Sequence, residues 1–145
     1  MLQAIAQEQP DQVLHLGDHA GDAVRLQAAQ SALPVHGVCG NCDRQQEAPQ
    51  TLRLTLAGKT IFMTHGHLYQ VKTTPYRAVL AAEEAEADLL LYGHTHRATL
   101  FQYGNLWVMN PGTCSGTHPA TYGVVEIENG GISCQLKSLD APWEE

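Results

Sequence analysis

The hydrophobic and polar positions of this chain predict helices and strands in alternation, followed by a region of strands alone. Apolar residues at helical spacing, such as Leu2, Ile5 and Ala6, indicate the first helix. Asp22 is a suitable N-cap for a second helix, and Pro75 suits the first turn of a third. The helices are expected over residues 1–9, 22–33 and 75–87. The strands are expected over residues 13–16, 35–39, 52–56, 60–64, 88–92, 98–102, 106–109, 122–127 and 132–136.

The order of these elements favours an α/β fold. A strand, a helix and a strand follow one another near the start, which favours parallel strands joined by a crossover. Later strands flank the turn sequences Ala57-Gly58-Lys59 and Glu128-Asn129-Gly130-Gly131, which predict hairpins. We therefore expect two mixed β-sheets packed face to face as a β-sandwich, flanked by helices. The length of 145 residues, without repeats or a linker, predicts a single domain over residues 1–145.

Composition and charge narrow the classes of partner. The hydrophobic fraction of 43% is ordinary for a globular protein, and the net charge of -7 argues against nucleic acid or an anionic membrane as a partner. No window approaches the roughly 18 apolar residues of a membrane span, and the first residues lack the pattern of a signal peptide. We therefore expect a cytoplasmic protein whose four cysteines are reduced thiols. A homodimer is the working expectation for its oligomeric state.

Polar residues with metal-binding side chains follow four of the predicted strands. Glycine accompanies each of them, and a last Gly-containing loop follows a fifth strand. The motifs are Gly17-Asp18, Gly40-Asn41-Cys42-Asp43, His65-Gly66-His67, Gly93-His94-Thr95-His96 and Asn110-Pro111-Gly112-Thr113. A carboxylate, an amide oxygen and several imidazoles form a mixed oxygen and nitrogen set. Such a set suits Mn²⁺, Fe, Ni²⁺ or Zn²⁺ better than Ca²⁺ or Mg²⁺.

These five motifs, in this order and on strand ends, resemble those of the calcineurin-like metallophosphoesterases. The resemblance covers nearly the whole chain and is greatest to the small YfcE-type phosphodiesterase branch, which also includes the retromer scaffold subunit. It implies a hydrolase with two divalent metal ions, Mn²⁺ first among them, that cleaves phosphodiesters or small phosphomonoesters. A metal-bridging hydroxide would attack phosphorus in line.

The resemblance also implies a role for each motif residue. Asp18 would bridge the two metals, while Asn41, His65 and His94 would complete the second metal and His96 would bind the first. His67 is the expected phosphate contact or proton donor. The cleft around the metals would be shaped by Cys42, Asp43, Asn110 and Gly112.

This chain departs from the family pattern at its start. The family opens with a strand that ends in Asp-x-His, and both of those residues bind the first metal. This chain reaches Gly17-Asp18 without such a segment, and His19 is a poor substitute because consecutive residues tend to point in different directions. We therefore expect a domain that is incomplete at its N-terminus, through a lost start rather than degeneration. Such a domain would have two unpaired strand edges, weak occupancy of the first metal and reduced activity.

A second departure is Cys42, which stands where many relatives carry a histidine that acts as general acid or contacts phosphate. A thiol is a poor match for that histidine in geometry and charge. YfcE-type members often lack the same histidine, which fits modest activity on substrates with good leaving groups.

Other interpretations are open at the level of sequence. A non-catalytic scaffold with the phosphoesterase fold is the main alternative. A thiol redox protein using Cys39 and Cys42 is a weaker one, since a single C-x-x-C has low specificity.

Several of the polar residues also have purely structural explanations. Asp18 suits a helix N-cap, and Asn41 suits a turn. His15 and His36 lie inside predicted strands, where packed or hydrogen-bonded histidines are expected. His118 lies in a loop rich in Gly, Thr and Pro, and we do not assign it to the site.

Overall fold

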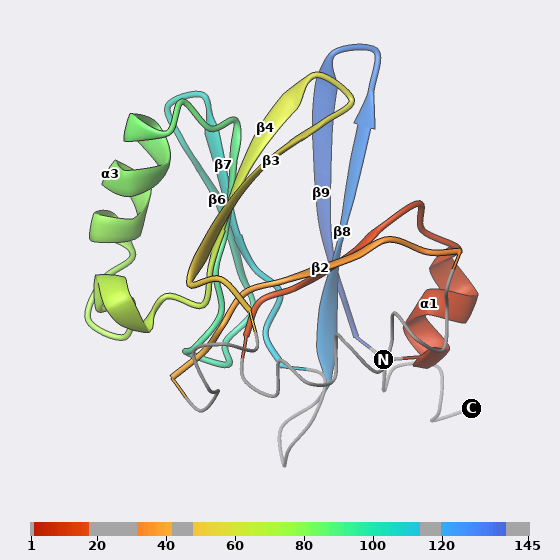
Figure 1. The fold of residues 1–145 in the computed structure, drawn as a ribbon, viewed down its shortest axis with the longest axis horizontal. Helices are drawn as coiled ribbons and strands as arrows, with labels where there is room; N and C mark the ends of the chain where they lie inside the picture. Colours follow the sequence, from red (N-terminus) through yellow and green to blue (C-terminus); the bar gives the residue numbers. More distant parts are fainter. Residues whose placement is uncertain (1, 18–31, 42–47, 114–119, 139–145) are drawn as a thin grey trace.

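The computed structural model describes residues 2–17, 32–41, 48–113 and 120–138, and its elements follow the predicted order (Figure 1). The helices are α1 (Leu2–Glu8), the 3-10 turn η2 (His67–Tyr69) and α3 (Tyr76–Glu84). The strands are β1 (Val13–His15), β2 (Val35–Gly37), β3 (Thr51–Leu56), β4 (Lys59–Thr64), β5 (Leu89–Leu91), β6 (Thr99–Tyr103), β7 (Leu106–Asn110), β8 (Thr121–Glu128) and β9 (Gly131–Ser138). The helix predicted over 22–33 lies mostly outside the described residues. No described helix is long and apolar enough to cross a membrane.

A five-stranded mixed sheet forms the centre of the fold. Its order is β3-β4-β5-β7-β6, with β4, β5 and β7 parallel and an antiparallel strand at each edge. Strand β5 is buried along its whole length because both faces of the sheet are covered. Leu90 packs toward α3, whereas Leu89 and Leu91 pack toward the opposite layer. The carboxyl end of β5 therefore leaves the middle of the core as it reaches Gly93 and His94.

Helix α3 covers one face of the central sheet (Figure 1). Its residues Ala78, Val79 and Ala82 are buried against Leu90 and Val108 of the sheet. Small side chains on this face let the helix axis approach the sheet closely. The opposite face of α3 is solvent-exposed and carries charged residues, as expected for an amphipathic surface helix.

The other face of the sheet is covered by two separate ribbons. Strands β1 and β2 pair in parallel, and β8 and β9 form an antiparallel hairpin. Both ribbons pack apolar residues, such as Leu14 and Val125, against Leu89, Leu91 and Met63 of the central sheet. This arrangement confirms the predicted mixed α/β fold with packed sheets.

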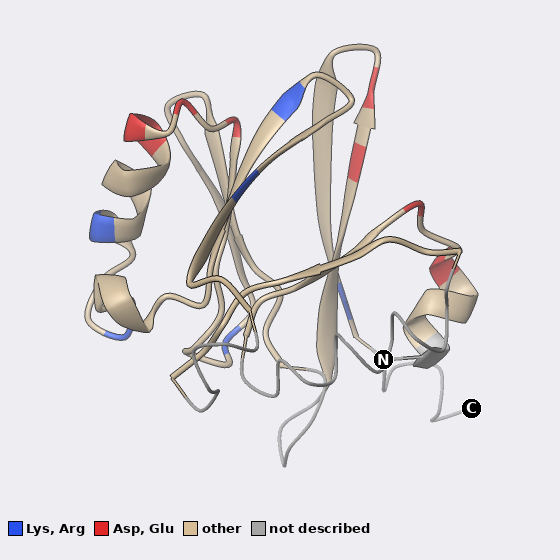
Figure 2. Ribbon diagram, viewed as in Figure 1, with Lys and Arg blue, Asp and Glu red and all other residues tan. Residues whose placement is uncertain are grey.

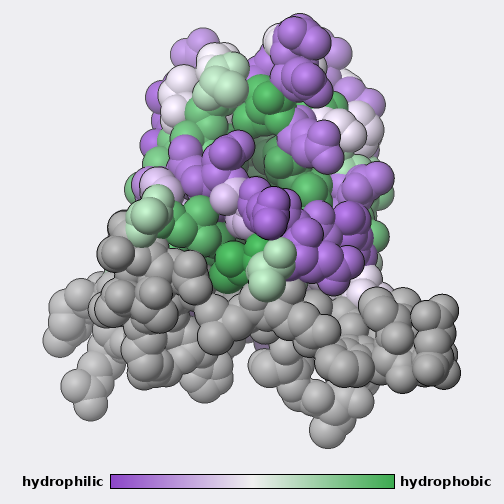
Figure 3. All heavy atoms as spheres, turned by 90° about the vertical axis from the view of Figure 1, so that its right-hand side faces the viewer, coloured by the Kyte–Doolittle hydropathy of each residue, from purple (hydrophilic) through white to green (hydrophobic). Residues whose placement is uncertain are grey.

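Neither ribbon of this second layer is paired on both sides. Within the described residues, β1 pairs only with β2, and β8 only with β9. No residue of β1 or β8 is fully buried, and apolar side chains are visible at the surface on the β8–β9 side (Figure 3). Each ribbon therefore has unpaired strand edges within the described residues.

Helix α1 is tied to the β8–β9 hairpin by one polar cluster. The hydroxyl of Tyr122 donates to Glu8 Oε2 at 2.6 Å, and the Lys137 ammonium lies 2.9 Å from the same oxygen. The hydrogen bond from Tyr122 and the charge of Lys137 lower the pKa of Glu8. The cluster links residues 114 positions apart in the sequence.

The stabilising effect of Tyr122 should disappear as pH rises from about 10 to about 12. Burial and the neighbouring Glu8 raise the pKa of Tyr122 to about 12, whereas an unfolded tyrosine titrates near about 10. Over that range the unfolded chain loses a proton that the folded protein keeps. The contribution is therefore complete below about pH 10 and lost above about pH 12. Near pH 8, wild type should exceed Tyr122→Phe by about 1 kcal/mol in the free energy of unfolding, measured by urea titration.

The comparison isolates Tyr122 from the other tyrosines. Burial raises the pKa of Tyr92, and the neighbouring Tyr76 raises that of Tyr103. Both residues are present in wild type and in Tyr122→Phe, so their effects cancel. A stability difference that stays constant up to about pH 12 would contradict the assignment.

Candidate metal centre

Three side chains from three different loops converge at the carboxyl end of the central sheet. His65 follows β4, His94 follows β5, and Asn41 follows β2. His65 Nε2 lies 3.0 Å from Asn41 Oδ1 and 3.1 Å from His94 Nδ1. The structure therefore joins three of the residues that the sequence assigned to the second metal.

The other ring nitrogen of His65 determines which atom faces this cluster. His65 Nδ1 lies 2.8 Å from the backbone carbonyl oxygen of Leu16. A carbonyl can only accept, so Nδ1 carries the proton, and in the neutral ring Nε2 presents a lone pair. This lone pair points at Asn41 Oδ1, which is also an acceptor. This contact is satisfied by a proton on His65, by a metal ion between the two atoms, or by an amide turned so that its NH2 group donates to Nε2.

A metal ion suits this position better than a second proton on the ring. His65 is only 2% exposed, and a charged imidazolium there would lose its hydration. Histidines that bind metals usually donate their other N–H to a carbonyl or carboxylate, as His65 does to Leu16. The donor chemistry of the cluster therefore fits a transition-metal ion.

The distances between the donor atoms also fit one ion. Metal–nitrogen bonds of about 2.1 Å place two ligand atoms about 3.0 Å apart at a right angle, and about 3.4 Å apart at the tetrahedral angle. The observed 3.0 and 3.1 Å are also hydrogen-bond distances, so they are compatible with an octahedral ion such as Mn²⁺ without selecting it. Among the described residues, no three His, Cys, Asp or Glu side chains form such a group by themselves. In this part of the chain, the asparagine oxygen adds a third donor to the two imidazoles.

His67 lies beside this cluster. Its ring centroid is 5.5 Å from that of His65 and 6.2 Å from that of His94. His67 Nδ1 is buried and has no hydrogen-bond partner in the described part of the chain. A buried polar atom without a partner is uncommon and often marks a functional position. The imidazole thus lies next to the candidate metal position, and its Nδ1 is available for a hydrogen bond.

The structure gives less information about the remaining predicted site residues. His96 is exposed and has a positive φ of 61°, as His94 does at 68°. No hydrogen bond or ring contact joins His96 to the cluster in the residues that the structure describes. Asp18, Cys42 and Asp43 lie outside those residues, and so does His118.

Asn110 holds the loop that carries His94. It is fully buried, and its Nδ2 donates to the carbonyl of Gly93 at 3.1 Å and to Thr95 Oγ1 at 2.9 Å. Its Oδ1 accepts from the backbone N–H of Gly112 at 2.9 Å. One side chain thus fixes the residues before and after His94, which has strained backbone. The predicted cleft residues Asn110 and Gly112 act here as a clamp on the histidine loop.

Replacing Asn110 by aspartate should weaken metal binding about ten- to hundredfold, the range seen when residues behind metal ligands are changed. The carboxylate keeps the bond to Gly112 but cannot donate to Gly93 or Thr95, so the loop loses both restraints. Isothermal titration with Mn²⁺ measures the change. The matched control is Asn105→Asp, at an exposed turn position, which should bind as wild type does. Equal affinities for the two variants would show that the clamp does not position His94.

The two strand histidines have the structural roles expected of them. His36 Nε2 lies 3.0 Å from Gln12 Oε1, and His15 Nδ1 accepts from the backbone N–H of Gly17 at 3.3 Å. These bonds tie β1 to β2 and fix the turn that precedes Asp18.

The cysteines in the described part are buried or half-buried. Cys39 is 2% exposed, and its thiol donates to the carbonyl of Gly40 at 3.6 Å. Burial raises the pKa of Cys134 to about 11, so this thiol stays protonated and unreactive near neutral pH. These surroundings do not favour the redox interpretation, whose second cysteine, Cys42, lies outside the described residues.

Sequence reasoning missed two features of this region. The first is the carbonyl of Leu16, which orients His65; a backbone acceptor leaves no signal in residue type. The second is a cavity on the α3 side of the sheet, whose lining includes Tyr92, Thr95 and Arg97. Their position directly around the His94 motif was the one available hint.

Comparisons with known proteins identify the family of this chain. Residues 1–130 match the model of the calcineurin-like phosphoesterase superfamily domain. The probable metallophosphoesterase YsnB of Bacillus subtilis is 33% identical over 132 residues, which are 88% of this chain and 77% of YsnB. Phosphodiesterase YfcE of Escherichia coli K12 is 33% identical over 103 residues, or 63% of this chain and 52% of YfcE. The chain thus spans about half the length of YfcE.

One further relative and one solved structure extend the comparison. Vacuolar protein sorting-associated protein 29 of Schizosaccharomyces pombe is 29% identical over 105 residues, 72% of this chain and 56% of that protein. The crystal structure of a conserved Streptococcus pneumoniae protein, described as a predicted phosphoesterase, superimposes with a TM-score of 0.79 at 28% identity. The superposition covers 95% of this chain and 80% of the Streptococcus pneumoniae protein. Because the family model matches residues 1–130, most of its length, the chain belongs to the calcineurin-like phosphoesterase superfamily.

Proposed function

We propose that this protein is a metal-dependent phosphoesterase that hydrolyses phosphodiesters or small phosphomonoesters. The observation that carries the proposal is the convergence of His65 Nε2, His94 Nδ1 and Asn41 Oδ1 within 3.0–3.1 Å, in a member of this superfamily. The similarity to YfcE and YsnB supports the reaction class.

The residues present fit two divalent ions unequally. Asn41, His65 and His94 would hold one ion together with Asp18, which would bridge to the other. His96 would contribute to that other ion from an exposed position, so we expect it to bind more weakly. Bound divalent ions lower the pKa of water and neutralise phosphate oxygens in the transition state. Mn²⁺ is the ion we propose, on the mixed oxygen and nitrogen donor set.

His67 supplies what the metal ligands cannot. They point lone pairs toward cations, whereas the leaving group of a phosphate ester needs a proton or a hydrogen bond. His67 stands next to the cluster without being one of its donors, and its buried Nδ1 has no described partner. We assign it to the phosphate or the leaving oxygen.

Hydrolysis of bis(p-nitrophenyl) phosphate with and without Mn²⁺ tests the proposal. We expect turnover that requires added Mn²⁺, disappears with a chelator and returns when Mn²⁺ is restored, because the donor set binds cations reversibly. Absence of turnover under all of these conditions would overturn the enzymatic proposal. If Mn²⁺ still bound in that case, the alternative of a non-catalytic scaffold would be favoured, in keeping with the relative that is named for vacuolar protein sorting.

A further inference from the structure

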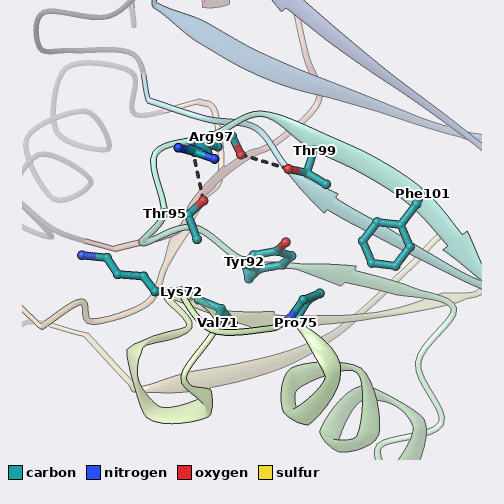
Figure 4. Close-up of a pocket in the computed structure, with 8 residues that line it drawn as sticks. All are labelled: Val71, Lys72, Pro75, Tyr92, Thr95, Arg97, Thr99 and Phe101. Carbon is teal, nitrogen blue, oxygen red and sulfur yellow. Dashed lines mark hydrogen bonds between the residues drawn. The ribbon is translucent and has the colours of Figure 1, made fainter.

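A cavity of about 510 Å³ lies on the α3 side of the central sheet, next to the loops that carry the histidines (Figure 4). Its apolar wall includes Val71 and Phe101, and Tyr92 lies between them. The cavity is open on one side and is lined by apolar and polar residues in about equal share, and its volume is in the range of small-molecule sites. It is separate from the three-atom cluster, whose residues do not line it.

The cavity and the candidate metal centre share the same two loops. In one loop, Tyr92 and Thr95 flank the Gly93-His94 pair and line the cavity. In the other, Val71 packs on Gly66, between His65 and His67. A Cβ added at Gly66 would lie 2.6 Å from Val71 Cγ2, which shows how closely the two are packed. A molecule in the cavity therefore lies beside the backbone that positions His65 and His94.

The charge of the cavity is opposite to that of the chain. Both charged residues that line it, Lys72 and Arg97, are basic, whereas the whole sequence has 15 acidic and 8 basic residues. Among the described residues, acidic side chains gather toward the end of the molecule where α3 ends and the β8–β9 hairpin turns (Figure 2). The hydroxyl of Thr99, on the β6 side, already donates to the backbone carbonyl of Arg97 at 3.3 Å, so the anion would be bound by the two basic side chains (Figure 4).

We propose that this cavity is a subsite for the arm of a phosphate ester that stays bonded to phosphorus when water cleaves the other P–O bond. The arm that fits is an aromatic or otherwise planar apolar group with a second negative charge. The apolar group would pack against Val71, Tyr92 and Phe101, and the charge would be bound by Lys72 and Arg97 at the rim. This inference rests on the proposed function, because it takes the phosphate to sit at the metal centre.

Calorimetric titration with two phosphonates tests the subsite without any need for turnover. The probes are 4-carboxybenzylphosphonate, which has the aromatic arm and the second charge, and methylphosphonate, which lacks both. We expect the first to bind Mn²⁺-loaded protein about tenfold more tightly. Arg97→Ala should remove the charge-dependent part of this preference, and Thr99→Trp, which fills the cavity, should remove most of it. The matched control is Arg77→Ala on the exposed side of α3, which should keep the full preference.

The outcomes separate the subsite from the proposed function. Equal affinities of wild type for the two probes, or a preference that survives in both Arg97→Ala and Thr99→Trp, would overturn the subsite. A preference that behaves as expected in a protein without Mn²⁺-dependent hydrolysis would uphold an anion-binding cavity and refute the enzymatic role. Mn²⁺-dependent hydrolysis by a protein that shows no preference between the two probes would uphold the enzymatic role and refute the subsite. An unfolded variant would bind neither probe, so the loss of preference counts only where the variant still binds methylphosphonate as tightly as wild type does.

Discussion

Replacing His65 by alanine should lower Mn²⁺-dependent phosphodiester hydrolysis by at least about a hundredfold, since even residues behind the ligands cost ten- to hundredfold. His65 is the hub of the cluster, because its Nε2 is the atom that lies close to both Asn41 and His94. Its loss leaves the other two donors without their common neighbour. The variant should therefore fail to bind Mn²⁺ tightly, and calorimetric titration alongside the hydrolysis assay would measure both effects.

The matched control for His65→Ala is His36→Ala. His36 is also a partly buried histidine after a strand start, but its ring bonds to Gln12 and not to the cluster. It should therefore keep wild-type Mn²⁺ affinity. Thermal unfolding of both variants without metal separates a loss of ligation from a loss of folding. If His65→Ala were to bind Mn²⁺ as wild type does, the metal centre would have to lie elsewhere.

Local sequence patterns were sufficient for the order of elements. The runs around Leu90 and Val108 are short, apolar and bounded by turn residues, and both formed buried strands. The turn η2 was not foreseen. It lies between Gly66 and Gln70, both in left-handed conformation, and a glutamine in that conformation has no clear signature in the sequence. The division of the second layer into the β1–β2 and β8–β9 ribbons could not be predicted from local sequence patterns either, because strand pairing depends on residues far apart in the sequence.

For the candidate site, the order of the motifs indicated which loops would meet. The contacts within those loops could be learned only from the structure. Asn41, His65 and His94 were grouped from their places on strand ends, and the structure brings their donor atoms together. The clamp by Asn110 depends on a buried amide reaching back 17 residues to Gly93. The cavity is lined by common residue types from separate segments, so apart from the closeness of some of them to the His94 motif, no pattern in the sequence marked it. Positions that act through backbone contacts are the ones that sequence reasoning misses.

Gly17 is such a position, and Gly17→Ala should impair the metal centre although glycine has no side chain to bind with. Its φ is +103°, which favours glycine, and a Cβ there would lie 2.7 Å from His65 Nδ1 and 2.9 Å from His65 Cγ. The added methyl would push the ring away from the Leu16 carbonyl that orients it. We expect a loss of about 1–3 kcal/mol in the free energy of unfolding from backbone strain. We also expect a ten- to hundredfold loss of Mn²⁺ affinity, about the effect of losing an orienting contact.

Gly58→Ala separates these two effects. Gly58 also has a positive φ, +83°, but nothing lies within 4 Å of an added Cβ. This control therefore carries backbone strain without a clash, and it should lose stability while binding Mn²⁺ as wild type does. Urea titration measures the first quantity and calorimetry the second. If Gly17→Ala lost only as much as Gly58→Ala in both measurements, His65 would not depend on the space that Gly17 leaves. A selective loss of Mn²⁺ affinity in Gly17→Ala would instead show that the glycine before Asp18 is needed to seat the ring of His65.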